Sequence, residues 1–194
     1  MSKKIEIELR ILLKNRKAIE KTVIQKGAVL IKHLKVKDFW YCSKNVHTYR
    51  KASIDRSGFA LRLRIEKDLS LKKTKSSIEC KTLQSGKNHA ECNEYELPVE
   101  DLFQARKLLE SINFKEFLVI EKERKVYKYQ KFSLFFDKIE GVGHGLEIEI
   151  MSTKGTEKVR YNQLLNLAIE LGISQSEILK KSLTYIAMQK LANF

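Results

Sequence analysis

The sequence predicts an α+β protein in which eight mostly antiparallel strands form a closed barrel, with charged side chains inside it and helices packed outside. Four short segments support this prediction, because each has a charged residue at every second position and apolar residues between: 5–11, 61–65, 78–81 and 146–150. Such alternation is typical of a strand with one apolar and one polar face. An ordinary solvated face would mix Thr, Ser, Gln and Lys. These polar positions are almost all acids or strong bases, which favours a site for a polyanion together with metal ions.

A repeated order of elements is the second observation. A strand with Glu6 and Glu8, a helix and three strands are followed by a strand with Glu94 and Glu96, a helix and three more strands. Eight mostly antiparallel strands are enough to close a barrel. In such a barrel the apolar faces would point outward, beneath the helices, and the charged faces would point inward. This arrangement explains why the same strands carry one strongly apolar and one strongly charged face.

The first half begins with a strand over about residues 4–12 and a helix over about 15–26. The helix has an apolar stripe at helical spacing, and Gly27 follows it at the position of a left-handed C-terminal cap. The polar stretch 43–58 is expected to be irregular. Three strands complete this half, over about residues 33–41, 59–66 and 77–83.

The second half begins with a strand over about residues 90–97, and Pro98 suits the first turn of the helix that follows it. Ser174 and Glu177 have the spacing of a capping box and open a short helix near the C-terminus. The remaining elements are three strands over about 118–129, 131–139 and 146–151, and helices over about 156–171 and 182–191.

Length and composition indicate a folded protein, of which 43% is hydrophobic. Its length predicts one domain over residues 1–194, or at most two small ones. No apolar run approaches the ~18–20 residues that a membrane helix needs, so we expect no membrane partner and a cytoplasmic location. The odd number of cysteines, without a CxxC pair, predicts that Cys42, Cys80 and Cys92 are reduced.

The net charge of +14 has two interpretations. It suits a protein that binds nucleic acid or an acidic membrane, or an enzyme whose substrate is a highly anionic small molecule. The bases at alternate strand positions favour a focused pocket over a diffuse patch. They are Arg62, Arg64, Lys81, Lys122 and Arg124.

Paired carboxylates give the candidate metal site. Glu147 and Glu149 are two residues apart on one strand and project the same way, and Asp137 is on the preceding strand. Glu6 and Glu8 form a second pair of the same kind. Oxygen ligands suit Mg²⁺ or Mn²⁺. These ions usually keep several bound waters, and substrate phosphates supply the rest of their coordination shell. The alternative for each pair is an exposed strand face with ordinary salt bridges.

Arg62 and Arg64 form the matching cationic pair, because a guanidinium grips phosphate oxygens through two hydrogen bonds. We expect both to face the cavity and to tolerate substitution without a large loss of stability. Four further bases extend the set, and together with a metal they balance the charge of a triphosphate: Arg10, Lys81, Lys122 and Arg124.

These motifs resemble the CYTH superfamily, whose members form a triphosphate tunnel. The segment from Glu6 to Arg10 resembles the family's ExExK signature, although Arg10 replaces the usual lysine, and Cys92 stands where many members have a basic residue. The remaining matches follow in the family's order: Arg62 and Arg64 for the RxR strand, Lys81, Glu94 and Glu96, Lys122 and Arg124 for the KxR strand, Asp137, Glu147 and Glu149, and a C-terminal segment with Lys181.

The resemblance implies a role for each matched residue. One or two Mg²⁺ or Mn²⁺ ions would be held by Glu6, Glu8, Asp137, Glu147 and Glu149. The triphosphate would be bound by Arg10, Arg62, Arg64, Lys81, Lys122, Arg124 and Lys181. Among these bases, the catalytic residues would be Arg10, Lys81 and Arg124.

The resemblance also implies the activity. The compact length is most like that of the small prokaryotic class IV adenylyl cyclases, which convert ATP to cyclic AMP and pyrophosphate. The alternative within the family is a triphosphatase acting on inorganic tripolyphosphate or thiamine triphosphate. The alternative of another class is a non-catalytic module that binds RNA or polyphosphate, which inward-facing acids disfavour because they repel nucleic acid. A homodimer is plausible from the family alone.

Overall fold

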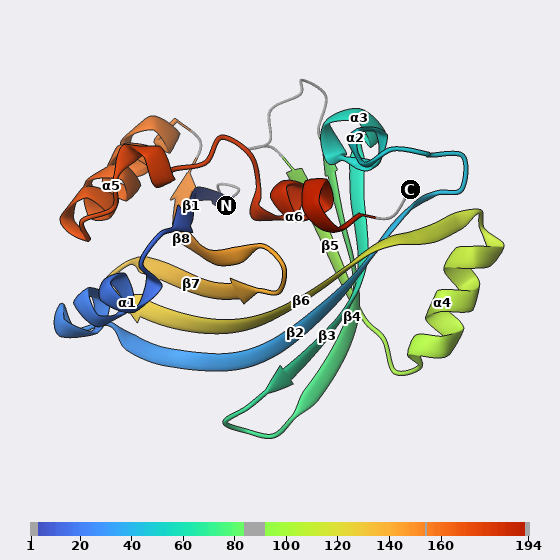
Figure 1. Ribbon diagram of the computed structural model, residues 1–194, viewed down its shortest axis with the longest axis horizontal. Coiled ribbons are helices and arrows are strands. Elements are labelled where there is room, and N and C mark those ends of the chain that lie inside the picture. Colours follow the sequence, from blue (N-terminus) through green and yellow to red (C-terminus); the bar gives the residue numbers. More distant parts are fainter. Residues whose placement is uncertain (1–3, 84–91, 154, 193–194) are drawn as a thin grey trace. The chain divides into compact units, whose positions relative to one another are not determined.

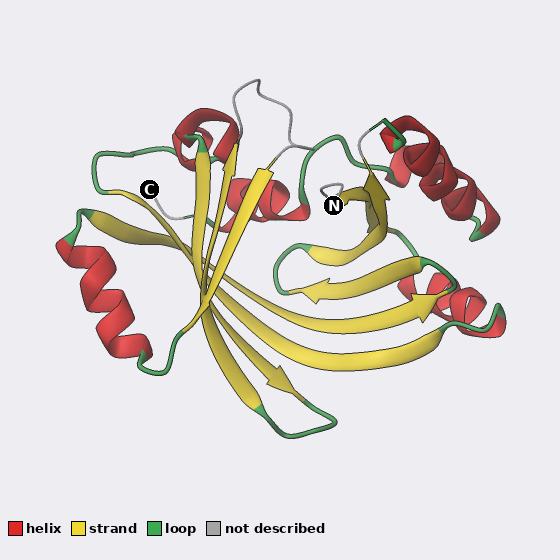
Figure 2. Ribbon diagram, turned by 180° about the vertical axis from the view of Figure 1, so that it is seen from behind, coloured by secondary structure: helices red, strands yellow, loops and turns green. Residues whose placement is uncertain are grey.

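The computed structural model describes residues 4–83, 92–153 and 155–192, and within these residues it has the predicted α+β character. Figure 1 shows the chain in sequence colours and Figure 2 shows its helices and strands from behind. The first half of the repeat comprises β1 (Lys4–Leu13), α1 (Arg16–Gln25), β2 (Val29–Ser43), α2 (Tyr49–Ala52), α3 (Ile54–Ser57), β3 (Phe59–Asp68) and β4 (Thr74–Leu83).

The second half repeats the order of strand, helix and three strands, and the C-terminal helices follow it. Its elements are β5 (Cys92–Pro98), α4 (Leu102–Ser111), β6 (Phe114–Tyr129), β7 (Phe132–Ile139), β8 (Gly143–Thr153), α5 (Glu157–Glu170), a 3₁₀ turn (Gln175–Glu177) and α6 (Leu183–Leu191). The predicted duplication of four strands and one helix is therefore confirmed.

The eight strands form one sheet in the order β1-β8-β7-β6-β2-β3-β4-β5. The register is antiparallel in β1–β8, β7–β8, β2–β3, β3–β4 and β4–β5. The fold class is thus confirmed in its eight strands and their pairing, whereas closure into a full barrel stays a prediction.

The chain divides into two compact units, each with its own layers. Unit 1 comprises Met1–His33 and Glu123–Leu183, and unit 2 comprises Leu34–Lys122 and Thr184–Phe194. The single domain over residues 1–194 stays a prediction.

In unit 1, α5 packs against β1 and β8 (Figure 1). The core beneath it takes the odd positions of β1, such as Leu9 and Ile11, with Ile148 of β8 and Leu164 of α5. Side chains alternate between the two faces of a strand. The opposite face of this sheet therefore carries the charged residues Glu6, Glu8 and Arg10 of β1, and Glu147 and Glu149 of β8.

In unit 2, the apolar face of the sheet packs with Leu109 of α4. Leu61 and Leu63 of β3 lie in this core together with Phe39 and Tyr41 of β2. The positions between them carry the charged residues of β3, so unit 2 also has one apolar and one charged face.

Two parts of the sequence prediction need correction. The polar stretch after β2 contains two short helices, because the side chain of Thr48 accepts a hydrogen bond from the backbone N–H of Lys51 and caps α2. β2 also begins at Val29 rather than near residue 33, since the turn after α1 at Gly27, where φ is +91°, leads directly into extended backbone.

The membrane and cysteine expectations can be compared with the described residues. No helix among them is long and apolar enough to cross a membrane. Cys42 and Cys80 are free thiols, whereas the side chain of Cys92 and the start of the strand predicted from residue 90 lie outside the described residues.

Candidate active-site residues

Three carboxylates gather on the charged face of unit 1. Glu8 of β1 lies directly opposite Glu149 of β8, and Glu147 is two residues before Glu149 on the same face. One carboxylate oxygen of each lies within 4.8 Å of the others. A set of three convergent oxygen ligands fits a hard divalent cation such as Mg²⁺ or Mn²⁺. The structure thus brings together three of the five predicted metal ligands.

The crowding of these acids changes the protonation of Glu149. Burial, followed by the charges of Glu6, Glu147 and Glu8, raises the pKa of Glu149 to about 8. The Arg124 guanidinium opposes this shift without cancelling it. A carboxyl that keeps its proton at neutral pH marks a place where negative charge is in excess, and a bound cation would relieve that excess.

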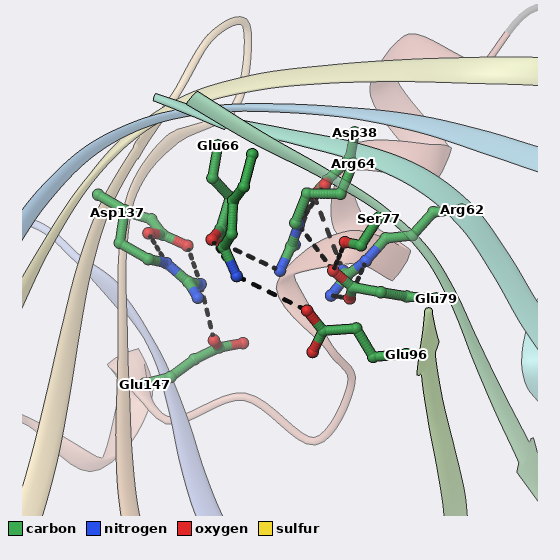
Figure 3. Close-up of polar contacts among 11 residues, drawn as sticks. Asp38, Arg62, Arg64, Glu66, Ser77, Glu79, Glu96, Asp137 and Glu147 are labelled. Atoms are coloured by element: carbon green, nitrogen blue, oxygen red, sulfur yellow. Dashed lines mark hydrogen bonds and ion pairs between the residues drawn. The ribbon is translucent and has the colours of Figure 1, made fainter. Parts of the chain in front are cut away.

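The other two predicted ligands have different surroundings. The carboxylate of Asp137 is almost fully buried and accepts two hydrogen bonds from Arg124, Nε to Oδ1 at 2.6 Å and Nη2 to Oδ2 at 2.6 Å (Figure 3). Glu6 is exposed and acts on Glu149 through its charge. Among the described residues, the group of three convergent carboxylates includes neither of them.

Two predicted bases of unit 1 lie among these acids. Arg10 forms an ion pair with Glu8, and Nη2 of Arg124 also donates to Glu147 at 3.2 Å. The Arg124 guanidinium lies over the ring of Phe135, 5.0 Å from its centroid. Each base is therefore next to a carboxylate of the candidate metal site.

Unit 2 carries the two predicted arginines of β3. Arg62 donates to Oε2 of Glu79 through Nε at 2.9 Å and Nη2 at 2.5 Å. Arg64 donates to Asp38 through Nε at 2.6 Å and Nη2 at 2.8 Å (Figure 3). Arg64 is thus held in the planar arrangement of two parallel hydrogen bonds that also binds phosphate, whereas both donors of Arg62 converge on a single carboxylate oxygen.

Burial separates the two arginines. The side chain of Arg62 is 15% exposed, whereas that of Arg64 is 9% exposed and pairs with a carboxylate that is 2% exposed. For Arg64 this burial and pairing favour a larger loss of stability on substitution than the sequence alone suggested. Removing it would leave the charge of Asp38 buried without its principal partner.

Asp38 is a site residue that the sequence prediction missed. Burial alone would raise its pKa, but the charge of Arg62, the hydrogen bonds and charge of Arg64, and the charge of Lys122 hold that pKa well below its ordinary range. The available signal was an acid within a strand otherwise rich in aromatic residues, where Asp is uncommon. Its neighbour Lys37 is also charged, so the local sequence did not indicate which of the two faces the site.

The remaining predicted bases have varied surroundings. Lys81 pairs with Glu94 across β4 and β5 at 2.5 Å, and its side chain is 43% exposed. Lys122 lies near enough to Asp38 to lower the pKa of that carboxyl. Lys181 is exposed and precedes α6. These positions are compatible with roles in anion binding, which stay predictions.

The charged face of unit 1 carries ligands for a hard cation, and that of unit 2 carries arginines suited to phosphate. Comparison with known proteins identifies the class. The CYTH domain matches residues 4–183. The chain therefore belongs to the CYTH family.

Three proteins, one matched by sequence and two by structure, show the range to which the chain is similar. A Methanocaldococcus jannaschii protein, provisionally described as an adenylate cyclase, is 31% identical over 90 residues, which are 46% of this chain and 51% of that protein. The chain thus matches about half the length of this curated relative. A solved structure from Pyrococcus horikoshii has a TM-score of 0.78 at 20% identity, covering 95% of this chain and 98% of that one.

The third protein has a reported activity of its own. It is a Hippeastrum protein, provisionally described as an adenylyl cyclase and reported to have a dominant triphosphatase activity. Its TM-score is 0.64 at 18% identity, with 96% of each chain covered. At this identity the likeness shows a shared fold.

Proposed function

We propose that the chain is a divalent-metal-dependent enzyme that converts ATP to cyclic AMP and pyrophosphate. The observation that carries the proposal is the group of Glu8, Glu147 and Glu149, which have carboxylate oxygens within 4.8 Å of one another. Arg10 and Arg124 pair with members of this same group. Such a combination suits a metal and a phosphate that bind together, because each neutralises the charge that the other brings.

The carboxylates of Glu8, Glu147 and Glu149 would hold Mg²⁺ or Mn²⁺. When bound, such an ion polarises phosphoryl oxygens and stabilises the charge of the transition state. Asp137 and Glu6 would support this set, Asp137 through its hydrogen bonds with Arg124 and Glu6 through its charge.

The bases would bind and orient the triphosphate. Arg62 and Arg64 offer forked donors, and Lys81, Lys122 and Lys181 offer point charges. Arg10, Lys81 and Arg124 would neutralise the charge that develops on the leaving pyrophosphate as the ribose 3′ oxygen attacks the α-phosphorus. In the resting protein Arg10 and Arg124 are paired with carboxylates, so these pairs must be exchanged for phosphate when the substrate binds.

A triphosphatase is the second candidate. It is favoured by the activity reported for the Hippeastrum protein, which has the same fold. The two reactions need the same metal and bases, and they differ in whether water attacks the terminal phosphorus or the ribose oxygen attacks the α-phosphorus. The substrate would then be inorganic tripolyphosphate or thiamine triphosphate.

One product assay separates these candidates. The purified protein is incubated with Mn²⁺ and either ATP or tripolyphosphate, and cyclic AMP, pyrophosphate and orthophosphate are measured. We expect cyclic AMP and pyrophosphate in equal amounts from ATP. Orthophosphate from tripolyphosphate, without cyclic AMP from ATP, would replace the cyclase by the triphosphatase. A Glu147→Gln variant is the control for a contaminating enzyme.

A further inference from the structure

We propose that Asp38 is a positioning residue, which fixes the guanidinium groups of Arg62 and Arg64 for phosphate binding. This inference rests on the proposed function, because it concerns how part of the triphosphate-binding set is held. Asp38 itself is 1% exposed and cannot present its carboxylate to solvent or to a substrate. Its effect on binding must therefore be exerted through the arginines.

The contact with Arg64 is direct and has fixed geometry. Each oxygen of Asp38 accepts one hydrogen bond, from Nε at 2.6 Å and from Nη2 at 2.8 Å. Two parallel bonds between planar groups determine the rotation as well as the position of the guanidinium. β2 and β3 place these two residues directly opposite each other in register.

Arg62 is held by the same network from several sides. Its Nη1 lies 3.7 Å from Oδ2 of Asp38, and its guanidinium lies over the ring of Trp40, 5.1 Å from the centroid. Glu79 accepts two hydrogen bonds from Arg62. Glu79 also lies near Arg64, with its Oε1 3.6 Å from Nε of that residue. Two anions thus lie next to both arginines, and Asp38 is the more buried of them.

Glu79 is more exposed than Asp38, which suggests that the two carboxylates have different roles. The side chain of Glu79 is 16% exposed, and Ser77 donates a hydrogen bond to its Oε1 at 3.0 Å. A phosphate can replace Glu79 as the partner of Arg62 because that carboxylate lies nearer the surface. Asp38 stays in place and keeps the donors aligned while this exchange occurs.

The positioning role and a purely electrostatic role of Asp38 predict opposite effects of Asp38→Asn on anion affinity. If Asp38 only added negative charge beside the arginines, Asp38→Asn would strengthen the binding of an anion. If Asp38 positions the arginines, the same change weakens anion binding, because the amide donates where the carboxylate accepts and cannot hold the fork. A purely structural role would lower thermal stability and leave the affinity of the folded protein unchanged.

The test is calorimetric titration of the folded protein with inorganic tripolyphosphate in the presence of Mg²⁺. We expect Asp38→Asn to weaken binding about tenfold or more, since hydrogen bonds to charged groups are lost. Asp38→Glu keeps the charge but moves the carboxylate by one methylene, and it should weaken binding as well. Glu121→Gln is the matched control, because Glu121 pairs with Lys37 in a half-exposed contact of the same unit.

Each result has a distinct meaning. Affinity in Asp38→Asn equal to or greater than that of the wild type overturns the positioning role. If Asp38→Asn does not fold, Asp38→Glu decides alone, and wild-type affinity in that variant overturns the proposal. If the wild type itself does not bind tripolyphosphate, the proposed function fails. That result differs from a failure of the positioning role, in which the wild type binds and the variants bind equally well.

Discussion

Glu8 and Glu149 are opposed directly across β1 and β8, so two acids occupy a pair of positions where like charges destabilise a sheet. Glu147 adds a third carboxylate within reach of both. Ionising all three is therefore costly without a cation, and Glu149, whose pKa is raised to about 8, avoids this cost at neutral pH by keeping its proton. A site that is unfavourable without a cation is expected to gain stability when one binds.

The first prediction concerns the pH dependence of stability without metal. The pKa of Glu149 is about 8 in the folded protein, against 4.5 as the reference value. Between these values the folded state holds a proton that the unfolded state lacks, so the free energy of unfolding falls as pH rises through this interval. We expect a fall of roughly 3 kcal/mol from this group between pH 5 and 8.

Urea denaturation in EDTA at several pH values measures this effect. The Glu149→Gln variant should lack this part of the fall, because its amide does not ionise. Glu121→Gln, which alters an exposed ion pair, should follow the wild type. Identical pH profiles for wild type and Glu149→Gln would rule out the raised pKa.

The second prediction concerns the metal. Activity on any triphosphate should require Mg²⁺ or Mn²⁺ and should collapse in Glu147→Gln or Glu149→Gln while the protein stays folded. Mn²⁺ at about 100 times its dissociation constant should also stabilise the wild type by about 2.7 kcal/mol. Thermal unfolding with and without Mn²⁺ measures this binding independently of turnover. Full activity and an unchanged shift in both variants would refute the metal assignment.

The third prediction separates the two arginines of β3. Arg62→Ala should raise KM or abolish turnover with a smaller loss of stability than Arg64→Ala, because Asp38 then keeps its two hydrogen bonds from Arg64 and Glu79 retains some contact with solvent. Arg64→Ala should cost about 3–5 kcal/mol of stability, because it leaves Asp38 buried beside one fewer cation. Thermal unfolding of the two variants under the same conditions measures the difference. Equal losses of stability would contradict the distinction drawn from their burial.

The sequence predicted the faces of the strands well because alternation is a local property. In β1, burial of Leu9 and Ile11 requires that Glu8 and Arg10 lie on the other face. The same reasoning predicted the charged face of β3. The sequence could not predict which acid would meet a base, since that depends on cross-strand register. The contact between Asp137 and Arg124 was therefore not foreseen, and the role of Asp137 as a metal ligand stays a prediction.

The last prediction tests the rival in which the chain is a module that binds RNA or polyphosphate. The net charge of +14 favours some attraction to any polyanion. If the chain is such a module, it should bind a long single-stranded RNA tightly, and this binding should weaken steeply between about 50 and 200 mM salt because it depends on released counterions. Binding of tripolyphosphate with Mg²⁺ should change less, because the forked arginines and the carboxylate group recognise a compact anion with its metal. Fluorescence anisotropy measures the RNA and calorimetry measures tripolyphosphate. Tight RNA binding that weakens steeply with salt, with no binding of tripolyphosphate, would favour the rival.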